Sequence, residues 1–186
     1  MACERPGGCW EAGMDEPRLG LLGATSLVGE CLLPLLTKAG WQVTAFSRRA
    51  IEQVGGVVEW RQISPADRQG DVKRADLAEW MREKITCWLC VAPLWVLADY
   101  LDILEASGVR RIVAMSSTSR FTKENSPDPA EQAVARRLAE AECHLQTWAE
   151  TKGVTWVILR PTLIYGRGRD KNVCEIARFI RRFGFF

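Results

Sequence analysis

Gly23-Ala24-Thr25-Ser26-Leu27-Val28-Gly29 is the stretch that decides the predicted fold, because it joins an apolar run at residues 18–22 to an apolar helical segment. A glycine at the end of a strand permits a tight turn, and a second one six residues later lets the following helix pack closely on that strand. Such a helix start offers free N–H groups and the positive end of its dipole to an anion. The stretch therefore predicts a site for the pyrophosphate of a dinucleotide. The alternative interpretation is a structural turn that binds no ligand.

The rest of the chain repeats one pattern, in which a helical segment ends at a glycine and a β-branched or aromatic run follows at once. Gly40, Gly108 and Gly153 stand at these junctions, where glycine fits the left-handed position just past a helix. Helices that alternate with strands favour a parallel sheet. We therefore predict an α/β fold: a Rossmann doubly wound parallel sheet with helices on both faces. About six strands are expected, at residues 19–22, 41–46, 57–60, 86–91, 111–115 and 155–159.

Two helical segments have a clear apolar period. The longer one is predicted to start with Asp128 as N-cap, Pro129 at the first helical position and Glu131 at the third. In the first helix, we expect Pro34 to remove one backbone hydrogen bond and to kink the helix. The apolar stripe of the longer segment contains Val134, Leu138, Ala141, Leu145 and Trp148, and the other stripe contains Leu94, Leu97, Leu101 and Leu104.

The composition is that of an ordinary globular domain, with 186 residues, 47% of them hydrophobic, and a net charge of +2. The balance of 25 basic against 23 acidic residues gives no case for nucleic acid as a partner. The longest uncharged run, residues 85–98, contains Pro93 and is too short to span a bilayer. The N-terminus has no apolar segment typical of a signal peptide. We therefore expect a cytoplasmic protein that binds neither nucleic acid nor a membrane.

Cys87 and Cys90 have the spacing of a redox or metal-binding pair. They lie inside an apolar strand-like run, however, where residues three apart point to opposite faces. We therefore favour two ordinary core cysteines and predict no metal site.

The glycine turn resembles the GxxGxxG fingerprint of the extended and atypical short-chain dehydrogenase/reductases. Gly23 and Gly29 match its outer glycines, whereas Ser26 replaces the central one. The Ser26 hydroxyl is expected either to cap the helix or to bond a phosphate oxygen. The resemblance implies that this region holds a nicotinamide dinucleotide, and the candidate contacts are Gly23, Thr25, Ser26, Leu27, Val28, Gly29, Ala92 and Pro93.

The end of the second predicted strand bears on which dinucleotide is bound. An acidic residue there would bind the ribose hydroxyls of NAD, whereas an arginine accommodates the 2′-phosphate of NADP. This chain has Ser47, Arg48 and Arg49 at that place and no acidic residue before Glu52. We therefore predict that NADP(H) is preferred, with NAD(H) as the alternative. The other interpretation makes one arginine a solvated charge of the next helix.

The resemblance continues through residues 113–121, the segment that in this family places a catalytic Ser or Thr just past the fifth strand. Ser117 matches that position best, and Ser116 and Thr118 lie within one residue of it. The resemblance implies that this hydroxyl bonds the reacting oxygen of a substrate, and Ser116 is also a candidate cofactor contact. The alternative is an ordinary serine-rich loop.

The next helix lacks the Tyr-x-x-x-Lys pair of the active family members. In that pair, the lysine lowers the tyrosine pKa, so that the tyrosine can act as general acid or base. Here Gln132 or Ala133 stands at the tyrosine position, and an arginine, which stays protonated, stands at the lysine position. Tyr100 and Tyr165, the two tyrosines of the chain, lie elsewhere. The usual proton relay is therefore predicted to be absent.

Residues 160–166, Arg-Pro-Thr-Leu-Ile-Tyr-Gly, resemble the RPxxxYG stretch of nucleotide-sugar epimerases and dehydratases. In those proteins the backbone after the proline meets the nicotinamide amide, which implies Pro161 and Thr162 as cofactor contacts. The resemblance covers about residues 18–186, and family members continue into a substrate domain. We therefore expect a flexible leader at residues 1–16, a Rossmann domain at residues 17–186, and most of the substrate domain to be missing.

The tail is a basic helical segment with Ile176, Phe179, Ile180 and Phe183 at helical spacing. We favour a packing stripe opposite a solvated basic face over a helix that contacts a diphosphate-linked substrate. Three functions remain open: an enzyme that transfers hydride to a nucleotide sugar or another small carbonyl substrate, a non-catalytic NADP(H)-binding regulatory protein, and a truncated inactive paralogue that forms a homo-dimer through its aromatic tail. The retained Ser117 favours the enzyme, and the missing tyrosine and lysine favour the binding protein.

Overall fold

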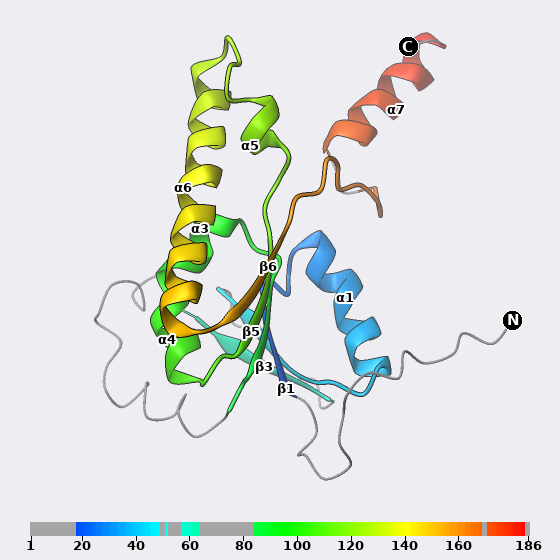
Figure 1. Ribbon diagram of the computed structural model, residues 1–186. Coiled ribbons are helices and arrows are strands. Elements are labelled where there is room, and N and C mark those ends of the chain that lie inside the picture. Colours follow the sequence, from blue (N-terminus) through cyan, green and yellow to red (C-terminus); the bar gives the residue numbers. More distant parts are fainter. Residues whose placement is uncertain (1–17, 49–50, 52–56, 64–83, 169–170, 185–186) are drawn as a thin grey trace, which may run out of the picture.

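One parallel sheet forms the centre of the protein, and helices cover both of its faces (Figure 1). The computed structural model describes residues 18–48, 51, 57–63, 84–168 and 171–184. The predicted leader at residues 1–16 and the candidate residue Arg49 therefore lie outside the described residues. In chain order the elements are β1 (Arg18–Leu22), α1 (Leu27–Lys38), β2 (Gln42–Ser47), β3 (Val58–Gln62), β4 (Cys87–Cys90), α3 (Leu94–Leu97), the 3₁₀ helix η2 (Ala98–Tyr100), α4 (Leu101–Ala106), β5 (Arg111–Met115), α5 (Ser119–Thr122), α6 (Pro129–Lys152), β6 (Thr155–Leu159) and α7 (Lys171–Phe183).

The strands lie in the order β3-β2-β1-β4-β5-β6, and each neighbouring pair is parallel. Helix α1 lies on one side of the sheet, and α3, α4 and α6 lie on the other (Figure 1). This arrangement confirms the predicted doubly wound Rossmann fold, and each of the six predicted strands is present with ends within two residues of the prediction.

The chain reverses its direction across the sheet between β1 and β4. From β1 it builds outward through β2 and β3, and it then crosses to the other side of β1 to form β4, β5 and β6. The loops that follow β1 and β4 therefore diverge at one edge of the sheet, where the Val91 N–H still donates to the Leu22 carbonyl at 2.9 Å. In folds of this kind, ligands bind in the crevice outside this switch point.

Two apolar layers hold the helices on the sheet. On the α1 side, Leu21, Val43 and Ala45 are almost fully buried beneath the helix. On the other side the core includes the predicted leucine stripe of α3 and α4, with Leu94, Leu97, Leu101 and Leu104 each at most 4% exposed. That stripe is confirmed, and it fixes the loop after β4 against the sheet.

Helix α6 begins as predicted, but its buried stripe is rotated. The Asp128 carboxylate accepts the Ala130 N–H at 2.8 Å, and Pro129 occupies the first helical position. The predicted stripe residues Leu138, Ala141 and Leu145 are buried, whereas Val134 is 38% exposed. Ala135, Glu142 and Ala149 complete the buried face instead.

Local predictions at the other helix ends are also confirmed. Gly40, Gly108 and Gly153 have φ angles of +86°, +76° and +67°, which is the left-handed region expected just past a helix. Helix α1 runs without interruption through Pro34, and the Thr37 hydroxyl donates to the Leu33 carbonyl at 3.2 Å one turn later.

Cys87 and Cys90 are both free thiols of β4. Burial raises the pKa of the Cys90 thiol to about 12, although a hydrogen bond to the Ala92 carbonyl lowers it in part. Within the described residues, no group of three or more His, Cys, Asp or Glu side chains could hold a metal ion.

Helix α7 extends away from the two layers (Figure 1). Its predicted apolar residues do share one helix, but they are not packed: Ile176, Phe179, Ile180 and Phe183 are 39%, 43%, 43% and 48% exposed. The Phe179 and Phe183 rings contact each other, with centroids 4.6 Å apart. No helix in the described part of the chain has the length and apolarity needed to cross a membrane.

Candidate functional site

The turn after β1 is as tight as the two glycines predict. Gly23 has a φ of +88°, and a Cβ atom at this position would lie 2.5 Å from the backbone nitrogen of Ala92. A Cβ at Gly29 would lie 2.4 Å from the Gly23 carbonyl oxygen. The first contact brings the loops after β1 and β4 together, and the second seats α1 on the strand end. Both predicted structural roles of these glycines are therefore confirmed.

Ser26, which replaces the central glycine of the fingerprint, is the N-cap of α1. Its hydroxyl accepts the Gly29 N–H at 3.0 Å, and its own N–H donates to the Gly23 carbonyl at 2.9 Å. Of the two uses expected for this hydroxyl, the structure shows the cap. The N–H groups of Leu27 and Val28 belong to the first helical turn and have no acceptor within the helix. They face the position where an anion would sit at the positive end of the helix.

Two connected cavities open at the switch point and share Ser26, Ala92, Pro93 and Trp95. The one beside β2, here called the β2 arm, has a volume of about 680 Å³ and is also lined by Leu22, Gly23, Thr25, Phe46, Ser47, Arg48, Ile63, Val96 and Tyr100. The one beside β5, here called the β5 arm, has a volume of about 420 Å³ and is also lined by Leu27, Val28, Val91, Leu94, Met115, Ser116, Ser117, Ser119, Val134, Leu138 and Ile164. The start of α1 thus lies between two arms of one cleft.

The β2 arm brings two predicted cofactor contacts to its wall. Ser47 is buried at the end of β2, and Arg48 follows it as an exposed residue whose carbonyl accepts the Gln62 side-chain N–H at 3.3 Å. The Phe46 ring, which also lines the arm, stacks on Trp88 with ring centroids 5.0 Å apart. A cationic side chain is therefore available where the second strand meets the cleft.

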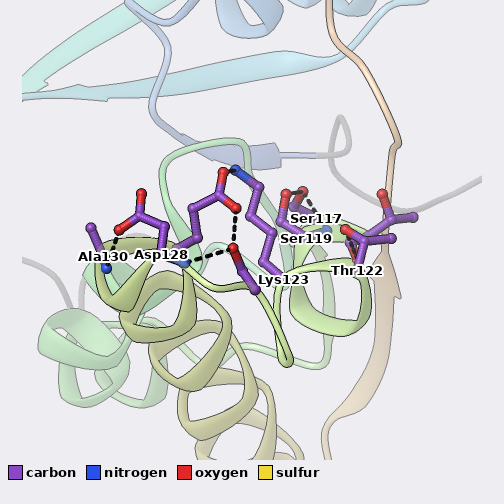
Figure 2. Close-up of polar contacts among 9 residues, drawn as sticks. Ser117, Ser119, Thr122, Lys123, Asp128 and Ala130 are labelled. Atoms are coloured by element: carbon purple, nitrogen blue, oxygen red, sulfur yellow. Dashed lines mark hydrogen bonds and ion pairs between the residues drawn. The ribbon is translucent and has the colours of Figure 1, made fainter.

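The β5 arm contains the predicted serine pair. Ser117 donates a hydrogen bond from its hydroxyl to the Ser119 hydroxyl at 3.1 Å and accepts the Ser119 N–H at 3.1 Å (Figure 2). Ser116 is buried, and both serines line the arm. The remaining wall of this arm is mainly apolar, with Val28, Met115 and Ile164 among its residues.

Helix α6 presents an apolar pair to the β5 arm. Val134 and Leu138, four residues apart, line the arm. The family resemblance placed the tyrosine position at Gln132 or Ala133 and the lysine position at an arginine, and none of these residues lines the arm. Gln132 instead donates to the Ser126 carbonyl at 2.8 Å. Neither side chain of the apolar pair carries a titratable proton.

The arginines of α6 are not among the residues that line the β5 arm. Arg137 lies over the Trp95 ring, with its guanidinium carbon 4.5 Å from the ring centroid. Arg136 lines a different cavity, together with Arg120 and Phe121. The arginine that the alignment placed at the lysine position therefore belongs to other contacts.

A buried carboxylate behind the serine loop was not predicted. Glu142 is 3% exposed, accepts the Ser116 hydroxyl at 2.5 Å, and receives two hydrogen bonds from the Arg160 guanidinium at 2.9 and 2.8 Å. Arg120 forms a further ion pair with it. The cluster links α5, α6 and the ends of β5 and β6. A signal was present in the sequence, since Glu142 lies four residues after Leu138 on the buried stripe.

Burial alone would raise the pKa of Glu142. The hydrogen bonds from Arg160 and Ser116 and the charges of Arg120 and Arg160 outweigh it, so that the pKa of this carboxyl is lowered. Glu142 is therefore ionised at neutral pH and holds Ser116 in place as a hydrogen-bond acceptor.

The segment before α6 is fixed by a second polar network (Figure 2). The Lys123 ammonium and the Ser126 hydroxyl each contact the Glu131 carboxylate at 2.7 Å. The hydrogen bonds from Lys123 and Ser126 lower the pKa of Glu131. Glu131 thus ties α6 to the preceding loop rather than closing a capping box at Asp128.

The proline-containing segment after β6 runs beside the serine loop. The Pro161 carbonyl accepts the N–H of Thr118 at 3.2 Å, and the Ser116 N–H donates to the Leu159 carbonyl at 2.8 Å. Thr162 is exposed, and Ile164 is the residue of this segment that lines the β5 arm. The structure therefore places Pro161 next to the cleft loop and Ile164 in the cleft.

Comparison with protein families adds to this geometry. Residues 23–175 match the model of a family described as NAD(P)H-binding, which covers most of the chain. The chain belongs to the NAD(P)H-binding family. The match runs from the glycine turn into α7 and therefore includes almost all of the residues that line the cleft. No curated protein matches the sequence.

Solved structures of similar fold include proteins of the short-chain dehydrogenase/reductase type. A UDP-N-acetylglucosamine 4-epimerase from Bacillus cereus is 17% identical with a TM-score of 0.63, covering 89% of this chain and 65% of its own. A UDP-glucose 4-epimerase from Thermotoga maritima, solved with UDP-glucose, is 16% identical with a TM-score of 0.59, covering 82% and 58%. A short-chain dehydrogenase/reductase superfamily protein from Agrobacterium tumefaciens with bound NAD is 16% identical with a TM-score of 0.57, covering 77% and 48%. This member of the NAD(P)H-binding family thus spans about half to two thirds of the length of these proteins, with which it shares the fold.

Proposed function

We propose that this protein binds a nicotinamide dinucleotide along the two-armed cleft, and that it prefers NADP(H) to NAD(H). The observation that carries the proposal is the glycine turn, where a Cβ at Gly23 would touch the β4 loop and the start of α1 opens between the arms. The pyrophosphate fits at this helix start because the N–H groups of Leu27 and Val28 and the helix dipole favour an anion there. The close backbone contacts at Gly23 and Gly29 fix the start of the helix at this place.

The two halves of the dinucleotide are assigned to the two arms. The adenosine half occupies the β2 arm beside Ser47 and Arg48, and the nicotinamide half occupies the β5 arm beside Ser116 and Ser117. Arg49 is proposed as a further contact from its place in the sequence alone. Around the pyrophosphate and along the cleft floor, the proposed contacts are Gly23, Thr25, Ser26, Leu27, Val28, Gly29, Ala92 and Pro93. Pro161 and Thr162 are proposed to meet the nicotinamide amide.

The preference for NADP(H) follows from charge. The 2′-phosphate of NADP adds about two negative charges at neutral pH, and a guanidinium binds phosphate through paired hydrogen bonds. Arg48 is exposed and lines the β2 arm, so it can approach this phosphate without first leaving a buried contact.

Arg48→Ala tests this assignment. We expect the variant to bind NADPH roughly 10- to 150-fold more weakly, because a charge-assisted contact contributes about 1.5–3 kcal/mol, and to bind NADH with unchanged affinity. The measurement is calorimetric titration of both cofactors, with Arg136→Ala as the control because Arg136 is an exposed arginine outside the cleft. Equal binding of NADPH and NADH by the wild type would reject the preference, and no thermal stabilisation by any of the four nicotinamide cofactors would reject the binding site itself.

A second candidate function, hydride transfer to a bound carbonyl compound, is favoured by Ser117 in the β5 arm. A bound nicotinamide would supply the hydride, and the Ser117 hydroxyl could donate a hydrogen bond to the carbonyl oxygen. Val134 and Leu138 offer no proton, so another donor would be needed. The apolar wall favours a small apolar carbonyl compound over a nucleotide sugar, whose hydroxyls need partners. Oxidation of NADPH by such compounds that is lost in Ser117→Ala would establish this function beyond binding alone.

A further inference from the structure

A cavity outside the two-armed cleft lies between α5 and the first half of α6, which pack side by side (Figure 1). This side cavity has a volume of about 310 Å³, and its lining includes Arg120, Phe121, Ala135, Arg136 and Ala139. It shares no lining residue with the β2 arm or the β5 arm. Small-molecule sites usually have volumes of roughly 300–1,000 Å³. The side cavity is therefore large enough to hold a small ligand of its own.

The charges around the side cavity favour an anion. Arg120 and Arg136 line it, the Arg120 side chain is 30% exposed, and Arg136 is exposed, so a ligand can reach both guanidinium groups. Glu124 also lines the cavity, and behind Arg120 the buried Glu142 pairs with Arg160 as well. Three guanidinium groups against two carboxylates leave one positive charge in excess. A ligand with a single negative charge balances it.

The other walls of the side cavity are apolar. Phe121 is 56% exposed, although the Arg120 guanidinium carbon lies 4.9 Å from its ring centroid. Ala135 and Ala139, one helical turn apart on α6, contribute only methyl groups and leave the space that larger side chains would fill. The cavity thus combines a small apolar surface with guanidinium groups, which bind planar carboxylates through paired hydrogen bonds.

We propose that the side cavity binds a small monocarboxylate with an aromatic or apolar body, independently of the dinucleotide in the cleft. The carboxylate pairs with Arg136 and with Arg120, and the body of the ligand lies against Phe121 and the two alanines. Arg120 can keep its ion pair with Glu142 at the same time, because a guanidinium group has five N–H donors. The protein would therefore hold two ligands in two separate sites.

Benzoate is the probe for this site, and benzamide, which has the same shape but no charge, is the matched compound. We expect benzoate to shift the backbone amide NMR signals of α5 and of the first half of α6, and to bind at least about 10-fold more tightly than benzamide. Equal binding of the two compounds would overturn the recognition of a carboxylate. Shifts confined to the residues of the β5 arm would place benzoate in the cleft and overturn the site, as would the absence of binding at about 10 mM benzoate.

Two variants test the charge and the space of the side cavity separately. Arg136→Ala should bind benzoate roughly 10-fold more weakly, the lower end for a charge-assisted hydrogen bond because Arg136 is exposed. Arg178→Ala, which removes an exposed arginine of α7, is the control and should bind benzoate as the wild type does. Ala139→Leu keeps all charges but fills the cavity, and it should abolish binding.

The melting temperatures of these variants show whether the fold is kept. Arg136→Ala removes an exposed side chain, so its melting temperature should stay within about 2 °C of the wild-type value. If either variant melts as the wild type does and binds benzoate with wild-type affinity, the side cavity is not the site and the proposal is wrong. The proposed binding of the dinucleotide is unaffected by that result, because the two sites share no residue.

Discussion

At the scale of the single residue, the shape of the cleft depends on a glycine, which has no side chain. Gly29 has no side chain because a Cβ there would lie 2.4 Å from the Gly23 carbonyl oxygen and 2.6 Å from that of Ala24. The backbone atoms of this contact belong to the turn after β1 and to the first turn of α1, so neither side can yield without moving the start of the helix. The N–H groups that would bind the pyrophosphate are positioned by this contact.

Gly29→Ala is therefore expected to lower the free energy of unfolding by about 2–3 kcal/mol, at the upper end of ordinary overpacking, and to weaken NADPH binding. Gly108→Ala provides the comparison, because Gly108 has a φ of +76° but nothing within 4 Å of an added Cβ. The free energy of unfolding of that variant should fall by only about 1–2 kcal/mol, the cost of a left-handed backbone conformation for a residue with a Cβ atom. Chemical denaturation of both variants measures the difference, and equal losses would mean that space at Gly29 is not limiting.

At the scale of the elements, one carboxylate joins the parts that carry the serine loop. Glu142 on α6 binds Arg160 after β6, Arg120 in α5 and Ser116 after β5. The Arg120 and Arg160 side chains keep 30% and 35% of their surface exposed, whereas that of Glu142 keeps 3%. Loss of the carboxylate would therefore leave two partly solvated cations and one serine without their acceptor.

Glu142→Gln is expected to destabilise the protein at neutral pH by about 2–3 kcal/mol, below the usual loss for a fully buried pair because both arginines reach water. The pKa of Glu142 is lowered in the folded protein, so its stabilising effect is present above the ordinary carboxyl pKa of 4.5 and is lost as the pH falls through the lower folded value. The difference between wild type and variant should thus shrink below pH 4.5. Thermal unfolding between pH 3 and 7, with the exposed Glu140→Gln as the control, measures it, and a pH-independent difference would contradict this account.

Sequence reasoning predicted the elements better than their rotations. The glycine turn, the alternation of helices and strands that favours a parallel sheet, and the caps at Asp128 and Gly153 are signals that local stretches of sequence carry in full. The residues of α6 that face the cleft cannot be predicted from such local signals. Each residue turns a helix by about 100°, so a shift of one position selects another face. The predicted buried stripe of α6 therefore included Val134, which is 38% exposed, and missed the buried Glu142. The partners of Glu142 come from three other elements, and no local pattern pairs them.

At the scale of the whole molecule, the sheet and its two helical layers form a body from which α7 extends (Figure 1). The apolar side chains of α7 remain 39–48% exposed, and Val157 and Leu159 of β6 are 47% and 49% exposed. These surfaces contribute little buried area to the described fold. The dimer predicted from the sequence would form through the α7 part of these surfaces.

A chain that ends at Gly168 is therefore expected to bind NADPH as the full chain does. Its melting temperature should differ by less than about 2 °C, which corresponds to under 1 kcal/mol for a domain of this size. Sedimentation of both chains over a range of concentrations tests the dimer, which should be lost with α7. A melting temperature several degrees lower at concentrations where both chains are monomeric would show that α7 packs on the rest of the fold.

The contact between Gly23 and the Ala92 backbone also determines how a ligand can arrive. Two loops that already touch at the limit set by their backbones cannot come closer at this point, so we expect the floor of the cleft to keep its shape when a ligand binds. Because these loops are already ordered in the free protein, they lose little conformational entropy when a ligand binds. Association should then be set by diffusion and by removal of water from the groove, with a rate that does not depend on a prior rearrangement.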